Sequence, residues 1–242
     1  MIVWNLLRVC LHLCIGLWTC ALVFPFTDDA GRAWRIKHWS VKLLAICGIE
    51  VEVVHSVAGP LAPRALIVAN HISWLDIFVI NTLHPCRFVA KSDIRNWPLI
   101  GWLCDKSGTI FIARGKLRDV RRIYEGLVHS LQVGEHVAFF PEGTTSLQGT
   151  VLPFHSNLFE AAVEAQVPVQ PFALRYVDAG GGFPKAIEFV GDMTFVESMV
   201  AILKAGRIRA ELIRLPLIET AGCHRRELGE AAREAISSVL SQ

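Results

Sequence analysis

Short apolar runs alternate with amphipathic stretches from residue 65 onward, and this alternation limits the fold more than any other feature. Runs such as ALIVA at 65–69 and HVAFF at 136–140 have the length of strands and are apolar almost throughout, as is typical of strands buried on both faces. Segments with helical periodicity, such as 117–131, lie between them. The pattern favours an α/β fold with a mostly parallel central sheet flanked by helices.

The same pattern predicts the positions of the individual elements. Predicted strands cover 65–69, 87–90, 109–113, 136–140, 169–177, 186–190 and 208–217. Predicted helices cover 117–131, 157–166 and 195–203, and an apolar stripe at 228, 232, 235 and 239 predicts a last helix. In such folds the active site lies beyond the carboxyl ends of the strands, so the polar residues that follow the predicted strands are the candidates.

The amino-terminal run 9–26 (VCLHLCIGLWTCALVFPF) is nearly all apolar, and a membrane-spanning helix needs about 20 such residues. No small-residue cleavage pattern follows it, which argues against a cleaved signal peptide. The chain is 52% apolar and 19% charged, against roughly 50% and 25% in ordinary globular proteins. We therefore predict a membrane-associated helical segment that crosses the bilayer once, re-enters or lies at its surface. A buried core helix is the alternative.

A basic stripe follows this run. Arg32, Arg35, His38 and Lys42 recur at spacings of three, three and four, so they share one face of a helix. Beside an apolar anchor, such a face suits anionic lipid head groups and predicts a place at the cell membrane, on its cytoplasmic face. A solvated helix face on a soluble protein would give the same pattern.

Composition weakens several other classes of function. A net charge of +2 gives no support to a nucleic-acid partner. The seven cysteines form no CxxC pair and no cluster with zinc spacing, and neither an HExxH motif nor a phosphate-binding glycine loop occurs. We therefore expect no metal and no bound cofactor.

The first chemical motif follows the strand 65–69. His71 can accept a proton near neutral pH, and a carboxylate on its other ring nitrogen, here from Asp76, would fix the tautomer. Five residues along a regular helix turn by about 500°, so the two side chains meet only if His71 lies on the strand-to-helix turn and Asp76 in the first helical turn. The alternative is a buried histidine that a nearby acid satisfies.

Three further blocks end or begin predicted strands. GTIFIAR delivers Arg114 at the end of a strand, and a guanidinium there suits a phosphate or a carboxylate. FPEGTTS offers the carboxylate of Glu142, the flexible Gly143 and the hydroxyl of Thr144. The fourth block, VPVQP, opens the next strand.

NHISWLD, GTIFIAR, FPEGTTS and VPVQP, in this order over roughly 65–177, resemble the four signature blocks of the glycerolipid acyltransferase family. That family includes enzymes that make phosphatidic acid from 1-acylglycerol-3-phosphate. The resemblance implies that His71 is the base and Asp76 its partner. It also implies a set of residues that bind the polar head of the acceptor lipid, with Lys91 the weaker candidate: Arg114, Glu142, Gly143, Thr144 and Lys91.

One position departs from the family pattern. Many lysophosphatidate acyltransferases have FPEGTRS in the third block, whereas this chain has Thr145 in place of that arginine. Losing one charge-assisted contact to a phosphate would cost about 1.5–3 kcal/mol. The resemblance still implies acylation of 1-acyl-sn-glycerol-3-phosphate as the first expectation. Because of Thr145, lyso-ornithine lipid or another lysophospholipid is the alternative acceptor.

The expected donor is an acyl thioester, on coenzyme A or on acyl carrier protein. Backbone N–H groups near the helix start after His71 are candidates for stabilising the oxyanion. The chain lacks a G-x-S-x-G elbow, which argues against a hydrolase of lipids or thioesters. Such a hydrolase, and a non-catalytic membrane module with the same fold, are the alternatives from other classes.

Two further features complete the prediction. The apolar segment 97–103 is expected to face lipid or an acyl chain, with core packing as an equal alternative. His155, which has Glu160 five residues on, is expected to have a structural role. The chain thus divides into an amino-terminal membrane anchor with its basic helix (1–48) and an acyltransferase domain (49–242).

Overall fold

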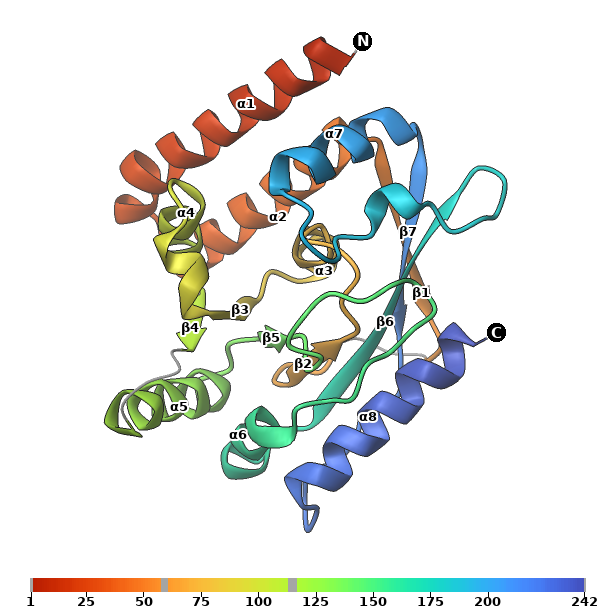
Figure 1. Cartoon of the computed structure of the whole chain (residues 1–242). Helices are drawn as coiled ribbons and strands as arrows, with labels where there is room; N and C mark the ends of the chain where they lie inside the picture. The colour runs from red at the N-terminus through yellow and green to blue at the C-terminus, as the bar shows by residue number, and fades with distance from the viewer. Residues whose placement is uncertain (1, 58–60, 113–116, 242) are drawn as a thin grey trace.

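The computed structural model describes residues 2–57, 61–112 and 117–241. Within these ranges seven strands form one sheet with the order β1-β7-β6-β2-β5-β3-β4 (Figure 1). Neighbouring strands pair in parallel, except that β6 and β7 are antiparallel. The predicted α/β fold with a mostly parallel sheet is confirmed. The strands are β1 (Ile49–His55), β2 (Leu66–Ala69), β3 (Arg87–Lys91), β4 (Ile110–Ile112), β5 (Val137–Phe139), β6 (Val169–Asp178) and β7 (Ile208–Arg214).

Helices cover both faces of the sheet. On one side lie α1, α2, α3 and α7, and on the other lie α5, α6 and α8 (Figure 1). Each layer closes its own apolar core: Leu43, Val79 and Ile202 belong to the first, and Leu127, Phe159 and Leu228 to the second. The helices are α1 (Ile2–Trp18), α2 (Asp29–Ile46), α3 (Asp76–Leu83), α4 (Ile100–Lys106), α5 (Leu117–Gln132), α6 (Phe159–Ala165), α7 (Phe195–Ala205) and α8 (Arg225–Leu240).

Most predicted elements are confirmed. Helix α4 was not predicted, and two further differences concern strands. The range 186–190 is not a strand: Lys185–Ile187 form a 3-10 turn, and Ile187 is fully buried in the core. An apolar run of this length cannot by itself distinguish a strand from a buried turn. The sequence analysis also missed β1, where Glu50 and Glu52 interrupt the apolar run at alternate positions. This strand forms the edge of the sheet, so polar residues on it reach solvent.

The apolar amino-terminal helix is longer than predicted. It begins at Ile2 and runs through one π-helical turn (Thr19–Val23) and a 3-10 turn (Phe24–Phe26). Its 25 residues have a mean hydropathy of 2.0 in their most apolar window, so length and composition would allow it to cross a membrane. Only 28% of that window is buried. Large apolar side chains therefore stand exposed along the helix: Val3, Trp4, Leu7, Leu11, Ile15, Trp18 and Leu22.

The opposite face of α1 packs on the rest of the chain. α1 contacts α2 and α7, and it lies above both in Figure 1. His12 and Trp39 lock α1 to α2 in both directions: His12 Nε2 lies 2.9 Å from the carbonyl oxygen of Trp39, and the indole N–H of Trp39 donates to the carbonyl of His12 at 3.1 Å. Gly16 permits this approach, because a Cβ there would lie 2.8 Å from Trp39 Nε1. One face of α1 is thus fixed to the domain while the other stays bare.

Candidate active site

The site is built at the carboxyl end of β2, a central strand between β5 and β6. All residues of this strand are buried, as expected for a strand with helices on both faces. Asn70 continues the pairing with its side chain: its amide donates to the carbonyl of Leu174 at 2.9 Å and accepts from the N–H of Leu174 at 2.7 Å. These two bonds fix the chain where it leaves the sheet, one residue before His71.

The predicted pair is present. His71 Nδ1 lies 2.8 Å from Asp76 Oδ2, and Asp76 is the first residue of α3. His71 therefore lies on the strand-to-helix turn and Asp76 in the first helical turn, as the spacing required. A carboxylate can only accept, so Nδ1 carries the proton and Nε2 is left as the acceptor. The His71 side chain keeps 18% of its surface exposed, whereas that of Asp76 has none.

Asp76 is held by more than the histidine. Its Oδ2 also accepts from the backbone N–H groups of Ile72 at 2.7 Å and Ser73 at 2.9 Å, which closes the turn on itself. Its Oδ1 accepts from the hydroxyl of Tyr176 at 2.6 Å. A buried carboxylate needs such donors to stay ionised. Because every donor points at the charged form, Asp76 is organised as a fixed negative charge beside the imidazole.

Tyr176 is a site residue that the sequence analysis missed. It lies on β6, 100 positions away from Asp76, and is fully buried. Burial, together with the negative charge of Asp76, raises the pKa of Tyr176 well above its usual value, so the hydroxyl keeps its proton and acts as a donor. The available signal was a single tyrosine in the apolar strand of the fourth block, since a buried tyrosine hydroxyl usually has a partner.

One face of the His71 ring is covered by apolar packing. The ring stacks on Phe140 at 3.9 Å with an angle of 7° between the planes. Phe140 in turn stacks on Phe88 at 6.0 Å. This packing fixes the rotation of the imidazole and keeps water off one of its faces.

The third block folds beneath this turn, and Glu142 points into the protein. The side chain is only 4% exposed. Its Oε1 accepts from the backbone N–H of His71 at 2.7 Å and its Oε2 from that of Leu152 at 2.9 Å. Burial raises the pKa of Glu142, while these two donors act in the opposite direction. Glu142 therefore joins the turn that carries His71 to the loop after β5; contact with an acceptor head group stays a prediction.

The N–H groups at the start of this turn have partners. Those of Ile72 and Ser73 donate to Asp76, and that of His71 donates to Glu142. The expectation that N–H groups just after His71 bind the oxyanion is therefore wrong for Ile72 and Ser73. The carboxylates of Asp76 and Glu142 accept from these N–H groups, and the resulting hydrogen bonds hold the turn in its bent shape.

The remaining residues of the third block shape the loop. Gly143 has a φ of 68°, and a Cβ there would lie 3.1 Å from the ring of His155, so both backbone and space favour glycine. Thr144 is exposed. The Thr145 hydroxyl, where the family often has an arginine, donates to the carbonyl of Phe189. The loop is tied further by the N–H of Ser146, which donates to the carbonyl of His71 at 2.7 Å.

Lys91 and Arg114 are the other two residues predicted to bind the head group. Lys91 is the last residue of β3 and is exposed, and it pairs in register with Ile112 at the end of β4. It therefore lies at the carboxyl edge of the sheet, on the side where the His71 turn lies. Arg114 falls outside the described residues. Among the residues that the structure describes, no group of three or more His, Cys, Asp or Glu side chains could hold a metal ion.

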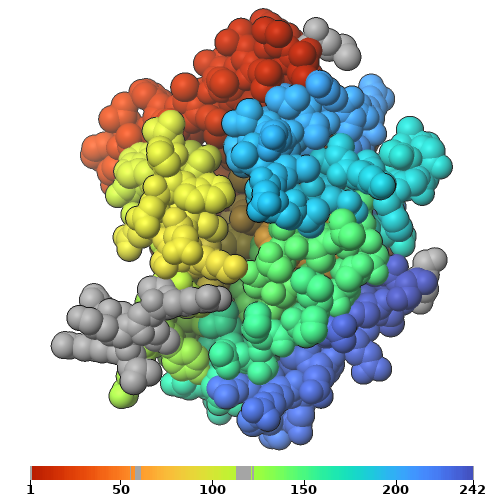
Figure 2. Space-filling view, viewed as in Figure 1, coloured from red at the N-terminus to blue at the C-terminus, as the bar shows by residue number. Residues whose placement is uncertain are grey.

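The surface is hollowed near this edge of the sheet. Figure 2 shows a depression between the yellow segment that contains α4, the blue segment that contains α7 and the green loop after β5. The yellow rim carries exposed apolar side chains, Trp97, Leu99 and Trp102. Their exposure argues against core packing for these three residues, whereas contact with lipid or an acyl chain stays a prediction.

Comparisons with known proteins identify the family to which the chain belongs. The model of the family described as Acyltransferase matches residues 50–175. The lyso-ornithine lipid O-acyltransferase of Pseudomonas aeruginosa is 38% identical over 205 residues, which cover 84% of this chain and 77% of that protein. The 1-acyl-sn-glycerol-3-phosphate acyltransferase of Neisseria meningitidis serogroup B is 43% identical over 143 residues, 57% of this chain and about half (54%) of the relative.

The crystal structure of the 1-acyl-sn-glycerophosphate acyltransferase of Thermotoga maritima has the same fold. It superposes with a TM-score of 0.67 at 19% identity and covers 100% of this chain and 99% of that one. The family model alone spans half of the chain, and its limits enclose both His71 and Glu142. The chain is therefore a member of the acyltransferase family.

Proposed function

We propose that this protein transfers an acyl chain from a thioester to the free hydroxyl of a lysolipid. The observation that carries the proposal is the pair of His71 and Asp76, 2.8 Å apart at the carboxyl end of a central strand. A half-buried imidazole with its Nδ1–H held by a buried carboxylate is suited to take a proton from a hydroxyl.

The reaction follows from this geometry. Nε2 of His71 removes the proton from the lysolipid hydroxyl while its oxygen attacks the thioester carbonyl. The imidazolium that forms is stabilised by Asp76, whose charge is already fixed by its donors. The tetrahedral intermediate collapses, the thiolate leaves, and His71 returns the proton to it. The ester product and the free thiol balance the reaction without an acyl-enzyme intermediate, a metal or a bound cofactor.

The acyl donor is proposed to be acyl-coenzyme A or acyl carrier protein. Both present the acyl chain as a thioester with the same leaving group, so the chemistry at His71 would be identical. They differ in size and in the charges around the thioester, and a direct comparison in the assay distinguishes them.

The acceptor head group has two candidates. Relatives named lyso-ornithine lipid O-acyltransferase align over 72–84% of this chain, whereas those named 1-acyl-sn-glycerol-3-phosphate acyltransferase align over 51–57%. Thr145 points the same way, because its hydroxyl is engaged by Phe189 and it adds no positive charge for a phosphate. Both observations favour lyso-ornithine lipid over lysophosphatidate.

Membrane association is proposed from α1. The helix fixes one face to α2 and α7 and exposes the other, so lying in the membrane surface would bury the bare side chains without tearing the helix from the domain. The two exposed tryptophans and the exposed leucine of the α4 rim would meet the same lipid layer. This arrangement would bring the hollow between α4 and α7 to the bilayer, where the lysolipid resides, and the cytoplasmic face is where the acyl thioesters are found.

The test is acylation by membranes that contain the expressed protein. Labelled acyl-coenzyme A or acyl carrier protein is combined with one acceptor at a time: lyso-ornithine lipid, lysophosphatidate or another lysophospholipid. Product lipids are identified by mass, and His71→Ala serves as the control.

We expect a diacyl product that the His71→Ala variant forms at least about 10³-fold more slowly. Lyso-ornithine lipid as the best acceptor would support the assignment from Thr145, whereas exclusive use of lysophosphatidate would overturn it. Thioester consumption without any acceptor would indicate a hydrolase instead. Full activity of His71→Ala would refute the mechanism.

A further inference from the structure

A single peptide group links helix α8 to the turn that carries His71. The carbonyl of Val151 accepts from Nη2 of Arg233 at 2.8 Å, and the N–H of Leu152, on the other side of the same peptide bond, donates to Oε2 of Glu142 at 2.9 Å. Arg233 Nε also donates to the carbonyl of Leu152 at 3.1 Å. The guanidinium and the carboxylate are thus joined through the Val151–Leu152 peptide.

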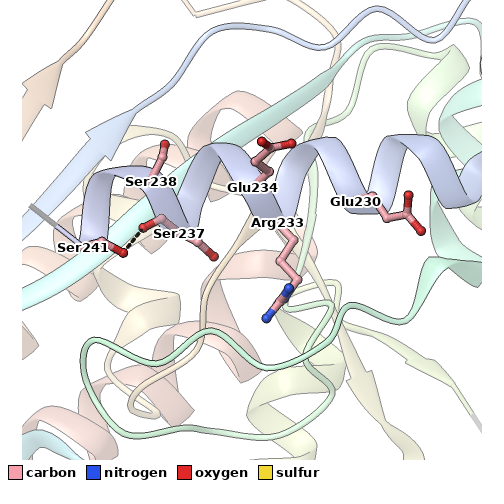
Figure 3. Close-up of a pocket in the computed structure, with 6 residues that line it drawn as sticks. All are labelled: Glu230, Arg233, Glu234, Ser237, Ser238 and Ser241. Atoms are coloured by element: carbon pink, nitrogen blue, oxygen red, sulfur yellow. Dashed lines mark hydrogen bonds between the residues drawn. The ribbon is translucent and has the colours of Figure 1, made fainter.

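The connection continues to the base. The second oxygen of Glu142 accepts from the backbone N–H of His71 at 2.7 Å. Arg233 is 82 positions away from Val151 and is not part of any of the four blocks. Figure 3 shows Arg233 projecting from α8 toward the green loop, beside other polar residues that line a shallow pocket on this helix.

Electrostatics explain why an arginine suits this place. Hydrogen bonds in a chain polarise one another, and a cation at one end strengthens the N–H donor at the other. Glu142 is nearly buried, and burial raises its pKa, while the N–H groups of Leu152 and His71 lower it. Arg233 holds the peptide that supplies the first of these two donors. In its ionised form Glu142 accepts from both Leu152 and His71 with a full negative charge shared between the two oxygens.

We propose that Arg233 is a positioning residue for the base: it fixes the Val151–Leu152 peptide, through that peptide the carboxylate of Glu142, and through Glu142 the backbone of His71. This inference rests on the proposed function, because it assumes that His71 is the base. Arg233 touches neither substrate nor the reacting atoms, so its effect falls on the turnover step rather than on binding.

The test compares Arg233→Gln with Arg233→Lys and with the matched control Arg226→Gln. Arg226 is an exposed arginine on the same helix. We expect Arg233→Gln to lower kcat by about 3- to 20-fold, the range for two charge-assisted hydrogen bonds acting indirectly, and to leave KM for donor and acceptor within about twofold. Arg233→Lys keeps the charge and is expected to recover part of the loss. Arg226→Gln is expected to behave as wild type.

The pH profile separates positioning from mere support of the fold. The charged and titratable groups along this network are His71 on the β2–α3 turn, His155 beside Gly143, and Arg233 on α8, with Glu230 and Glu234 near it on the same helix. Removing a positive charge makes protonation easier for the groups linked to it, and the network from Arg233 ends at the backbone of His71. The acid limb of the kcat profile is therefore expected to move to higher pH in Arg233→Gln and to return in Arg233→Lys.

A double variant tests the route. If Arg233 acts through Glu142, then Arg233→Gln has a smaller effect on kcat in a Glu142→Gln background than in wild type. Additive losses would overturn the proposed route. A lower thermal midpoint with an unchanged acid limb and an equal loss in Arg233→Lys would show that Arg233 only supports the fold.

Failure of the proposed function would look different. It would appear as absence of acyl transfer in wild type, or as activity that persists in His71→Ala, before any Arg233 variant is measured. A wild-type enzyme that depends on His71 and is unaffected by Arg233→Gln would overturn this inference alone.

Discussion

Two strands that follow each other along the chain, β2 and β3, end in very different structures. After β2 the chain forms a short turn whose polar groups all point inward, so that Asp76 and Glu142 together accept from three successive backbone N–H groups. After β3 the chain forms a 3-10 turn (Ser92–Asn96) and α4, where Trp97, Leu99 and Trp102 stand exposed. The first region fixes the position of His71. The second exposes apolar side chains at the rim of the hollow. Changes in the two regions should therefore affect different kinetic constants.

The largest effect is expected at the centre of the rigid region. Asp76→Asn puts an amide where four donors converge within the described part of the chain, so the imidazole loses both its charge partner and its tautomer. We expect kcat to fall by at least about 10²-fold with little change in KM. Steady-state kinetics on folded protein provide the measurement. A loss confined to KM would place Asp76 in substrate binding.

A smaller effect is expected at Tyr176, whose hydroxyl is a hydrogen-bond partner of Asp76. Tyr176→Phe removes the hydroxyl that donates to Asp76 at 2.6 Å and leaves the ring in place. We expect a loss of about 1.5–3 kcal/mol in unfolding free energy and a fall in kcat of about tenfold. Denaturant titration and turnover measured on the same preparation check both. If stability falls while kcat does not, the hydroxyl serves the core and not the base.

Glu142 allows a pH experiment on the same turn. Burial raises its pKa above the usual 4.5, so the folded state holds this proton more tightly than the unfolded state does. Its contribution to stability is therefore greatest below pH 4.5 and falls as the pH rises through the raised value. Relative to Glu142→Gln, wild type is expected to lose stability as the pH rises across that window. Thermal midpoints of the two proteins are measured in steps from pH 4 upward. If the midpoint of wild type rises with pH relative to that of Glu142→Gln, Glu142 is stabilised as an anion overall and the prediction is wrong.

The smallest effect is expected on the rim. Leu99→Asp with Trp102→Asp places two charges on exposed apolar surface and should leave the fold and the dyad intact. We expect recovery in the membrane fraction to fall by about two- to fivefold and the preference for acyl chain length to change. Val133→Asp, at another exposed apolar position, is the control. If recovery and chain-length profile match the control, the rim has no part in lipid contact.

The sequence predicted this site unevenly, and the reasons are physical. His71 and Asp76 are five positions apart, so a local turn decides whether they meet and the sequence shows the turn. Tyr176 and Arg233 reach the site from β6 and α8, and no local pattern reports a contact across such distances. Glu142 was found by its block, but a side chain's direction, inward to backbone rather than outward to ligand, depends on packing that the sequence does not display.

The fold shows the same division. Apolar strands with helices between them were predictable, because burial on both faces leaves a continuous apolar run. Strand β1 was not predicted, since Glu50 and Glu52 alternate along an edge. The range 186–190 was wrongly predicted as a strand, because Ile187 owes its burial to a turn packed on the core. Elements whose environment is one-sided or irregular are those that periodicity misjudges.

The crowded carboxylate of Asp76 has a consequence for where the reaction's proton can travel. Four donors among the described residues are directed at Asp76, so both of its oxygens are already engaged as acceptors. The hydrogen taken from the acceptor alcohol therefore stays on the imidazole until the departing sulfur collects it. The proton removed from the alcohol is thus the one that the thiol receives. Turnover should therefore neither take up protons from the solvent nor release them into it, apart from any ionisation of the free thiol.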